Sequence, residues 1–179
     1  AKNGRDKGYC GGGVRIGGAA HADSGVYDCR IVGNTVLCGQ GGGVACVVFG
    51  GVVSNCFVAC NTVTNVWEKG YNISEFGGGG ISFNYSGGAT VLQSTRTRGG
   101  RVFDCIVSNN LATGNSADGS GIRSARMGHW IENCRLIDNH ITCNDGGNLS
   151  MNGTIYCDRL AQVVGCTLTN NTYAGAIQH

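Results

Sequence analysis

The chain has 179 residues, a formal net charge of +2, 33 glycines, 11 cysteines and no proline. A charge this close to neutral gives no polybasic argument for binding nucleic acid or an anionic membrane surface. No apolar run approaches the roughly 18 to 20 residues that a membrane-spanning helix needs. Charged residues make up 13% of the chain, about half the usual share, which argues against long solvent-exposed helices.

An internal repeat divides the chain into five units, 11–40, 41–77, 78–119, 120–150 and 151–179, which we interpret as a single domain spanning 1–179. Each unit opens with a glycine-rich segment that ends in an aliphatic residue. These segments are 11–14, 41–44, 78–81, 121–122 and, in degenerate form, 153–155. Each unit then contains a short β-branched run around one anchor cysteine.

The same residue types surround every anchor cysteine. A β-branched aliphatic residue stands three positions before it, another aliphatic residue two positions after it, and an asparagine five positions after it. The anchor cysteines are Cys29, Cys56, Cys105, Cys134 and Cys166, and the asparagines are Asn34, Asn61, Asn110, Asn139 and Asn171. With 17 asparagines in the chain, five matches at one offset are far beyond chance.

Short β-branched runs separated by glycine and asparagine do not have the 3.6-residue periodicity of helices. We therefore predict an all-β fold, a right-handed parallel β-helix of about five coils with no capping helix. Stacked coils would bury an apolar interior that one coil cannot bury alone. Equivalent asparagines would form a hydrogen-bonded ladder along the stack, and the anchor cysteines would stack beside them in the interior.

The segments Gly41-Gly42-Gly43-Val44, Gly50-Gly51-Val52-Val53-Ser54-Asn55-Cys56 and Asn61-Thr62 resemble the right-handed parallel β-helix repeats of large bacterial and archaeal surface proteins of the pectate-lyase-like superfamily. They are more distantly similar to the GGA[ILV] repeats of chlamydial polymorphic outer-membrane proteins. The resemblance covers roughly 11–171 and implies the same architecture. It implies no single chemistry, because β-helices host lyases, hydrolases, adhesins and scaffolds.

The number of cysteines is odd, so at least one thiol is free, bound to something or paired with another molecule. We interpret the five anchor cysteines as small buried apolar side chains. The candidates for disulfides, including one between chains, are Cys10, Cys38, Cys46, Cys60, Cys143 and Cys157. No second pair accompanies Cys56 and Cys60, so we expect no zinc site. The cysteine content favours an oxidising, extracellular location.

The residues give little support for catalysis. Asp28 and Asp104 occupy equivalent positions two units apart, about 10 Å in a stack, near the upper limit for an inverting glycosidase pair. Asn55 lies between them, and a structural Asp/Asn ladder is the favoured interpretation. None of the four histidines recurs at a fixed spacing from a nucleophile: His21, His129, His140 and His179. We expect no catalytic residues, no cofactor and no metal.

Two further patterns were weighed. Arg96, Arg98 and Arg101 form a basic segment that fits either an acidic glycan or a solvated turn. Thr-x-Thr occurs at 62–64, 95–97 and 167–169. A flat threonine array would indicate ice binding, but these three pairs do not share one offset from the anchor cysteine, so we do not expect one.

The leading hypothesis is a non-catalytic extracellular structural protein that associates with copies of itself, head to tail or laterally, into a fibre, sheath or surface layer. Outward apolar positions support such contacts: Val32, Phe57, Ala59, Ile106 and Ile137. One alternative is a cell-surface adhesin or stalk that binds glycan through its insertions. Another is a fragment of a polysaccharide lyase or hydrolase. No nucleic acid or membrane span is expected.

Overall fold

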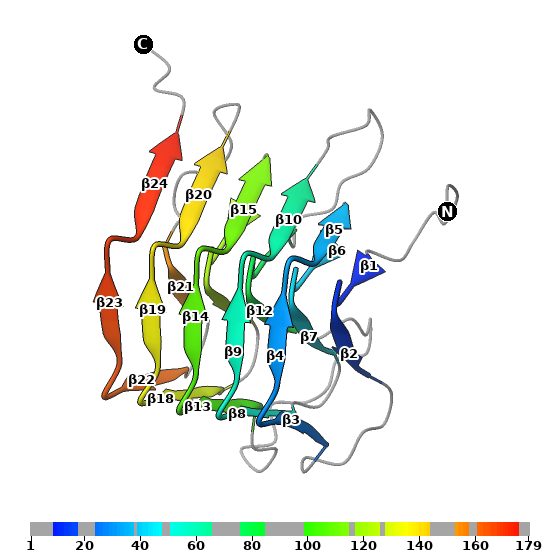
Figure 1. Cartoon of the computed structure of the whole chain (residues 1–179), viewed down its shortest axis with the longest axis vertical. Helices are drawn as coiled ribbons and strands as arrows, with labels where there is room; N and C mark the ends of the chain where they lie inside the picture. The colour runs from blue at the N-terminus through cyan, green and yellow to red at the C-terminus, as the bar shows by residue number, and fades with distance from the viewer. Residues whose placement is uncertain are drawn as a thin grey trace.

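The computed structural model describes residues 9–17, 24–37, 39–47, 51–65, 76–84, 99–114, 117–125, 128–143, 153–157 and 161–175. Within these ranges every regular element is a strand, and every strand pairing is parallel. Successive strands turn through up to five sheets and then return one rung further along the axis, so the fold is a parallel β-helix of five coils (Figure 1). The all-β solenoid predicted from the repeat is confirmed.

We name the sheets A to E in the order in which the chain enters them. Sheet A contains β1 (Tyr9–Cys10), β6 (Gly39–Gln40), β11 (Phe76–Gly77) and β16 (Ala117–Asp118). Sheet B contains β2 (Val14–Ile16), β7 (Val44–Val47), β12 (Ile81–Asn84), β17 (Ile122–Ser124) and β21 (Ile155–Cys157). Sheet C contains β3 (Gly25–Tyr27), β8 (Val52–Ser54), β13 (Arg101–Phe103), β18 (Trp130–Glu132) and β22 (Gln162–Val164).

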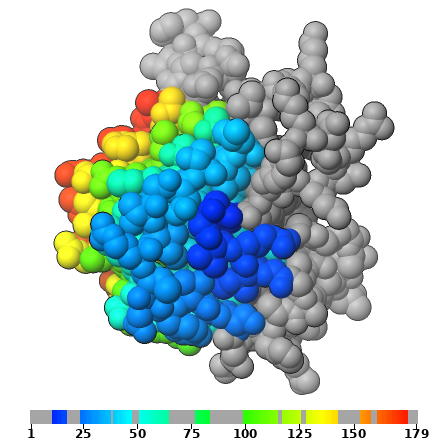
Figure 2. Space-filling model, turned by 45° about the vertical axis from the view of Figure 1, so that its right-hand side comes forward, coloured from blue at the N-terminus to red at the C-terminus, as the bar shows by residue number. Residues whose placement is uncertain are grey.

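Sheets D and E complete each coil. Sheet D contains β4 (Arg30–Val32), β9 (Phe57–Ala59), β14 (Ile106–Ser108), β19 (Arg135–Ile137) and β23 (Thr167–Thr169). Sheet E contains β5 (Thr35–Leu37), β10 (Thr62–Asn65), β15 (Leu111–Gly114), β20 (His140–Cys143) and β24 (Thr172–Gly175). The colours in Figure 2 follow this stacking, with the first coil in front and later coils behind it in chain order.

The pairing register places like residues over one another. The aliphatic residues three positions before the anchor cysteines form one interior column in sheet C, Val26, Val53, Val102, Ile131 and Val163. The aliphatic residues two positions after the anchor cysteines form a second interior column, in sheet D: Ile31, Val58, Val107, Leu136 and Leu168. In the three middle coils both columns are completely buried, at 0% exposure. The apolar interior is therefore continuous along the axis.

The glycine-rich segments form the corner between sheets A and B, where the solenoid is narrow. A Cβ atom on Gly43 would lie 2.9 Å from both Asn61 Nδ2 and Val58 Cγ1, across the interior. A Cβ atom on Gly42 would lie 2.3 Å from the carbonyl oxygen of Gly79 in the next coil. Contacts this short leave no room for a side chain, which explains why the repeat keeps glycine at these two positions.

Candidate functional site

The five asparagines lie at the corner between sheets D and E, with their side chains in the interior. Oδ1 of Asn110 accepts hydrogen bonds from the backbone N–H of Asn61 at 3.0 Å and from its Nδ2 at 3.1 Å. Nδ2 of Asn110 donates to the carbonyl oxygen of Val58 at 3.0 Å and to Oδ1 of Asn139 at 2.9 Å. The same links join Asn34, Asn61, Asn110, Asn139 and Asn171 in one ladder, as predicted.

The five anchor cysteines form a second ladder at the corner between sheets C and D. The backbone N–H of Cys56 donates to Sγ of Cys105 at 3.4 Å, and Cys56 Sγ donates to the carbonyl oxygen of Ser54 at 3.0 Å. Equivalent contacts involve Cys29, Cys134 and Cys166. The predicted burial holds for the three middle cysteines, at 0–3% exposure, whereas Cys29 is exposed and Cys166 half-buried. A cysteine here fills the core and also accepts a hydrogen bond from the backbone.

Both corners depend on the residue before the ladder residue. The sequence indicated such a column before the cysteines, at Asp28, Asn55 and Asp104, but not the one before the asparagines. The residue before each ladder cysteine and each ladder asparagine has a left-handed backbone with φ between 50° and 73°. These residues are Asp28, Asn55, Asp104, Asn133 and Gly165 before the cysteines, and Gly33, Cys60, Asn109, Asp138 and Asn170 before the asparagines. Nine of these ten are glycine, asparagine or aspartate, the types that tolerate this conformation, and that composition was the available signal.

Two thiols of the interior, those of Cys46 and Cys105, have raised pKa values. Burial raises the pKa of Cys46 to about 12. The hydrogen bond with the Cys134 thiol, together with burial, raises the pKa of Cys105. Because the thiolate is the nucleophile and the metal ligand, these cysteines are unreactive in the folded chain. They serve the stack rather than a reaction.

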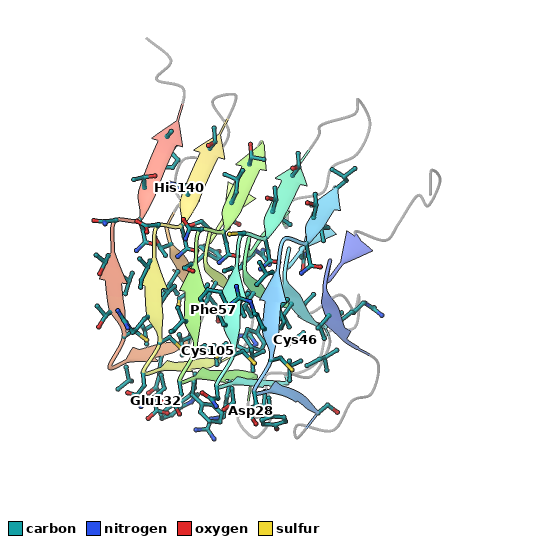
Figure 3. The ribbon with its side chains drawn as sticks, viewed as in Figure 1. Asp28, Cys46, Phe57, Cys105, Glu132 and His140 are labelled. Carbon is teal, nitrogen blue, oxygen red and sulfur yellow. The ribbon has the colours of Figure 1, made fainter. Side chains whose placement is uncertain are left out.

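No candidate whose side chain is described forms a disulfide within the chain, and the disulfide expected between chains stays a prediction. Cys46, Cys60 and Cys157 all carry free thiols, as do the five ladder cysteines. Cys46 lies in the apolar interior at 1% exposure, in the same column as Phe83, and its thiol is free (Figure 3 labels Cys46). Cys60 is one of the left-handed corner residues. The side chains of Cys10, Cys38 and Cys143 lie outside the described part of the chain.

These free thiols change the argument about location. Seven of the eight cysteines in the described ranges are explained by stacking, corner geometry or burial, without any disulfide. The cysteine content therefore no longer argues for an oxidising compartment. The extracellular location stays a prediction.

The carboxylates considered for catalysis lie at exposed corners. Asp28 and Asp104 both have left-handed backbones, with φ of 55°. Nδ2 of Asn55 donates to Oδ1 of Asp28 at 2.6 Å, which is the ladder contact favoured by the sequence (Figure 3 labels Asp28). The ladder contact gives Asp28 a structural role in joining the first two coils.

A buried ion pair on sheets A and B was missed by the sequence analysis. Asp118 and Arg123 are 2% and 3% exposed, and their side chains approach to 3.6 Å. The Arg123 guanidinium also lies 5.6 Å from the centre of the Tyr156 ring in the next coil. Burial raises the pKa of Asp118 to about 6, and this effect outweighs the opposing one of Arg123. The sequence offered little signal for this pair, because the column of Arg123 also contains Arg15 and Tyr156 besides the small residues Ala45 and Ser82.

A serine–histidine contact also lies in the interior. Ser124 Oγ is 2.8 Å from His129 Nδ1, and both residues are at most 3% exposed. The His129 ring packs against Phe83, with 4.9 Å between the ring centres. A substrate has no access to a pair buried this deeply, so we assign it to the packing between sheets B and C.

The apolar positions predicted to point outward lie on the outward face of sheet D. Val32 is 39% exposed, Phe57, Ile106 and Ile137 are half-buried, and Ala59 at 2% is covered. The guanidinium of Arg30 lies 4.6 Å from the centre of the Phe57 ring.

Sheet C carries the exposed aromatic residues Tyr27 and Trp130, at 48% and 43% exposure. It also carries Arg101, which lies 3.7 Å from Glu132 and over the Phe103 ring. Arg101 therefore has a carboxylate partner in the next coil, while Arg96 and Arg98 lie outside the described residues. Whether the basic segment binds an acidic glycan or forms a solvated turn stays a prediction.

Comparison of the chain with protein-family models, with curated proteins and with solved structures found no match. In the ranges that the structure describes, no three His, Cys, Asp or Glu side chains gather as a metal site would require. No helix in those ranges is long and apolar enough to span a bilayer.

We expect Asn110→Ala to reduce the free energy of unfolding by roughly 4 kcal/mol, because buried backbone groups of neighbouring coils lose their partners. Asn171→Ala should cost about half as much, because Asn171 is only half-buried and ends the described ladder. Urea unfolding of both variants measures this. Equal losses would contradict a ladder whose strength depends on burial.

We expect Cys46 and Cys105 to be alkylated at least about ten times more slowly than Cys60 in the folded chain, since the first two are 1% exposed and Cys60 is exposed. Alkylation with N-ethylmaleimide followed by peptide mass mapping gives the rate at each position. In urea the three rates should converge. A fast reaction of Cys46 in the native chain would disprove its interior position.

We expect Asp118 to make stability fall as pH rises. Its pKa is raised in the folded chain from 3.8 to about 6, so the native state holds the proton more tightly than the unfolded state. The resulting stabilisation is complete below about pH 4 and is lost through pH 6, an effect on the order of 3 kcal/mol. The unfolding free energy of wild type minus that of Asp118→Asn should decrease over this range. Parallel pH curves for the two proteins would contradict it.

Proposed function

We propose that this chain is a non-catalytic structural β-helix that associates head to tail with copies of itself. The observation that carries the proposal is the open core of coil 5. Val163, Leu168 and Tyr173 belong to the interior columns, yet they are 43%, 51% and 45% exposed. Residues of the same columns in the middle coils are at most 1% exposed. Exposed interior columns of this kind favour a covering surface, either a further part of the same protein or another molecule.

The direction of the ladders favours coil 1 of another copy as that partner. Along the whole asparagine ladder, the backbone N–H and Nδ2 of one coil donate to Oδ1 of the next. Coil 5 therefore presents donors at Asn171, and coil 1 presents the acceptor Oδ1 of Asn34. In the cysteine ladder, the N–H of Cys166 and Sγ of Cys29 are related in the same way. Coil 5 facing coil 5 would instead oppose donor to donor.

A contact between two different ends does not close on itself, so repeating it produces a filament. In coil 1 the corresponding interior residues Val26, Ile31 and Val36 are only 5–8% exposed. The core is therefore more open at coil 5 than at coil 1. The proposal includes an extracellular fibre, sheath or surface layer as the product. It also includes a relationship to the pectate-lyase-like β-helix repeats, supported by the glycine corners and the asparagine ladder.

We expect Leu168→Asp to abolish assembly, because the carboxylate would have to be buried in the joint between copies. Thr169→Lys is the matched control, since Thr169 is exposed on the outward side of the same strand and should leave assembly unchanged. Light scattering against concentration and negative-stain electron microscopy report filament length. A wild-type chain that stays monomeric, or that forms only a closed dimer in sedimentation, would overturn the proposal.

A further inference from the structure

The outward face of sheet E presents two parallel columns of side chains across the five coils. The first column is Thr35, Thr62, Leu111, His140 and Thr172, and the second is Leu37, Thr64, Thr113, Thr142 and Ala174. The residues between them, such as Val63 and Ile141, point into the core. All ten outward residues are exposed or half-exposed. Figure 1 shows the five strands side by side, and Figure 3 labels His140 on β20.

Threonine is concentrated on this face. The chain has 12 threonines, and six of them occupy these ten positions. The ten equivalent outward positions hold two threonines in sheet D, Thr167 and Thr169, and none in sheet C. A general preference of threonine for exposed strand positions would enrich all three sheets. The enrichment therefore belongs to sheet E.

The face is regular and stiff. Parallel pairing without slippage sets neighbouring coils about 4.8 Å apart, and alternate residues of a strand lie roughly 6.6 Å apart. The threonine side chain is branched at Cβ, so χ1 is restricted and each methyl and hydroxyl group keeps a defined direction. His140 Nδ1 and Thr172 Oγ1 are hydrogen-bonded across adjacent coils. The hydroxyls and methyls thus form a two-dimensional lattice on a rigid support.

The face also lacks the groups that other ligands use. None of its ten residues is Asp, Glu, Lys or Arg, whereas the outward face of sheet D carries Arg30 and Arg135. It has no Phe, Tyr or Trp ring, on which a sugar would stack, whereas sheet C has Tyr27 and Trp130 exposed. An uncharged ligand with its own regular array of hydrogen-bonding groups fits this surface best.

We propose that the outward face of sheet E binds the surface of ice. Methyl groups in a rigid array order the water that covers them, and hydroxyls at fixed spacing anchor that water by hydrogen bonds. The layer of water ordered in this way can join a growing ice crystal. The side chains of Leu37, Leu111 and Ala174 add apolar surface to the face. Of its ten residues, only His140 carries a ring.

The array was not predictable from Thr-x-Thr pairs, because these pairs do not recur at a common offset in the sequence. Only 62–64 supplies a complete pair on sheet E, whereas 167–169 belongs to sheet D and 95–97 lies outside the described residues. The remaining threonines of the face stand singly in their coils. They come together only when the register of sheet E aligns them.

The test compares three proteins for partitioning into a slowly growing ice shell and for arrest of crystal growth just below the melting point. Wild type should enter the ice phase and shape the crystals. The double variant Thr64→Lys, Thr113→Lys should lose both effects, because the ammonium groups disrupt the ordered water at the centre of the face. The control Thr167→Lys, Thr169→Lys makes the same changes on sheet D and should behave like wild type.

Circular dichroism and thermal unfolding establish that the variants are folded. If the lysine variant does not fold, Thr113→Lys alone replaces it, since Thr113 is half-exposed on the surface. Wild type that is excluded from ice like serum albumin overturns the proposal. Loss of ice binding in the sheet D control also overturns it. Binding to crystalline cellulose or chitin without any effect on ice overturns it in favour of a polysaccharide surface.

Discussion

The structure depends on satisfying the backbone N–H groups that turn inward at the corners of each coil. A strand pairs its peptide groups with the next rung, but a corner residue in the solenoid interior needs an acceptor of another kind. Asparagine supplies one between sheets D and E, where Oδ1 accepts at 3.0–3.1 Å. Cysteine supplies a weaker one between sheets C and D, where Sγ accepts at 3.4–3.5 Å. The spacing of these two residues fixes the length of sheet D in every coil.

The difference between the two acceptors follows from their surroundings. The cysteines lie in the larger apolar cluster with Val53, Val102 and Ile131, so a small side chain with low desolvation cost suits that corner. The asparagines face the glycine corner between sheets A and B, where Gly43 and Gly80 leave room for an amide. An amide can be buried there because the coils before and after it, together with a backbone carbonyl, use both its oxygen and its nitrogen. Each column therefore has the residue type that its position in the cross-section allows.

These constraints explain which features were predictable. The asparagine, cysteine and aliphatic residues recur at fixed offsets in the sequence, and stacking of the coils brings residues at the same offset into contact. Disulfides within the chain were not predictable, because cysteine spacing alone does not distinguish a thiol buried in the interior, such as Cys46, from one that is oxidised. Asp118 and Arg123 were missed for another reason. Alternation predicts that outward positions of sheet B are exposed, whereas Ser82 and Arg123 are buried there. The threonine face was missed because its members share a face without sharing a local motif.

The interior and the exterior of this solenoid are therefore under different constraints. Substitution in an interior column disturbs three coils at once, so those positions repeat with little variation. An outward residue contacts only its neighbours on one face, and the faces have diverged. Sheet C carries rings and paired charges, sheet D carries an apolar strip beside arginine, and sheet E carries hydroxyls and methyls. Among the described residues, the outward faces carry most of the variation between coils, because the ladders specify only that the coils stack.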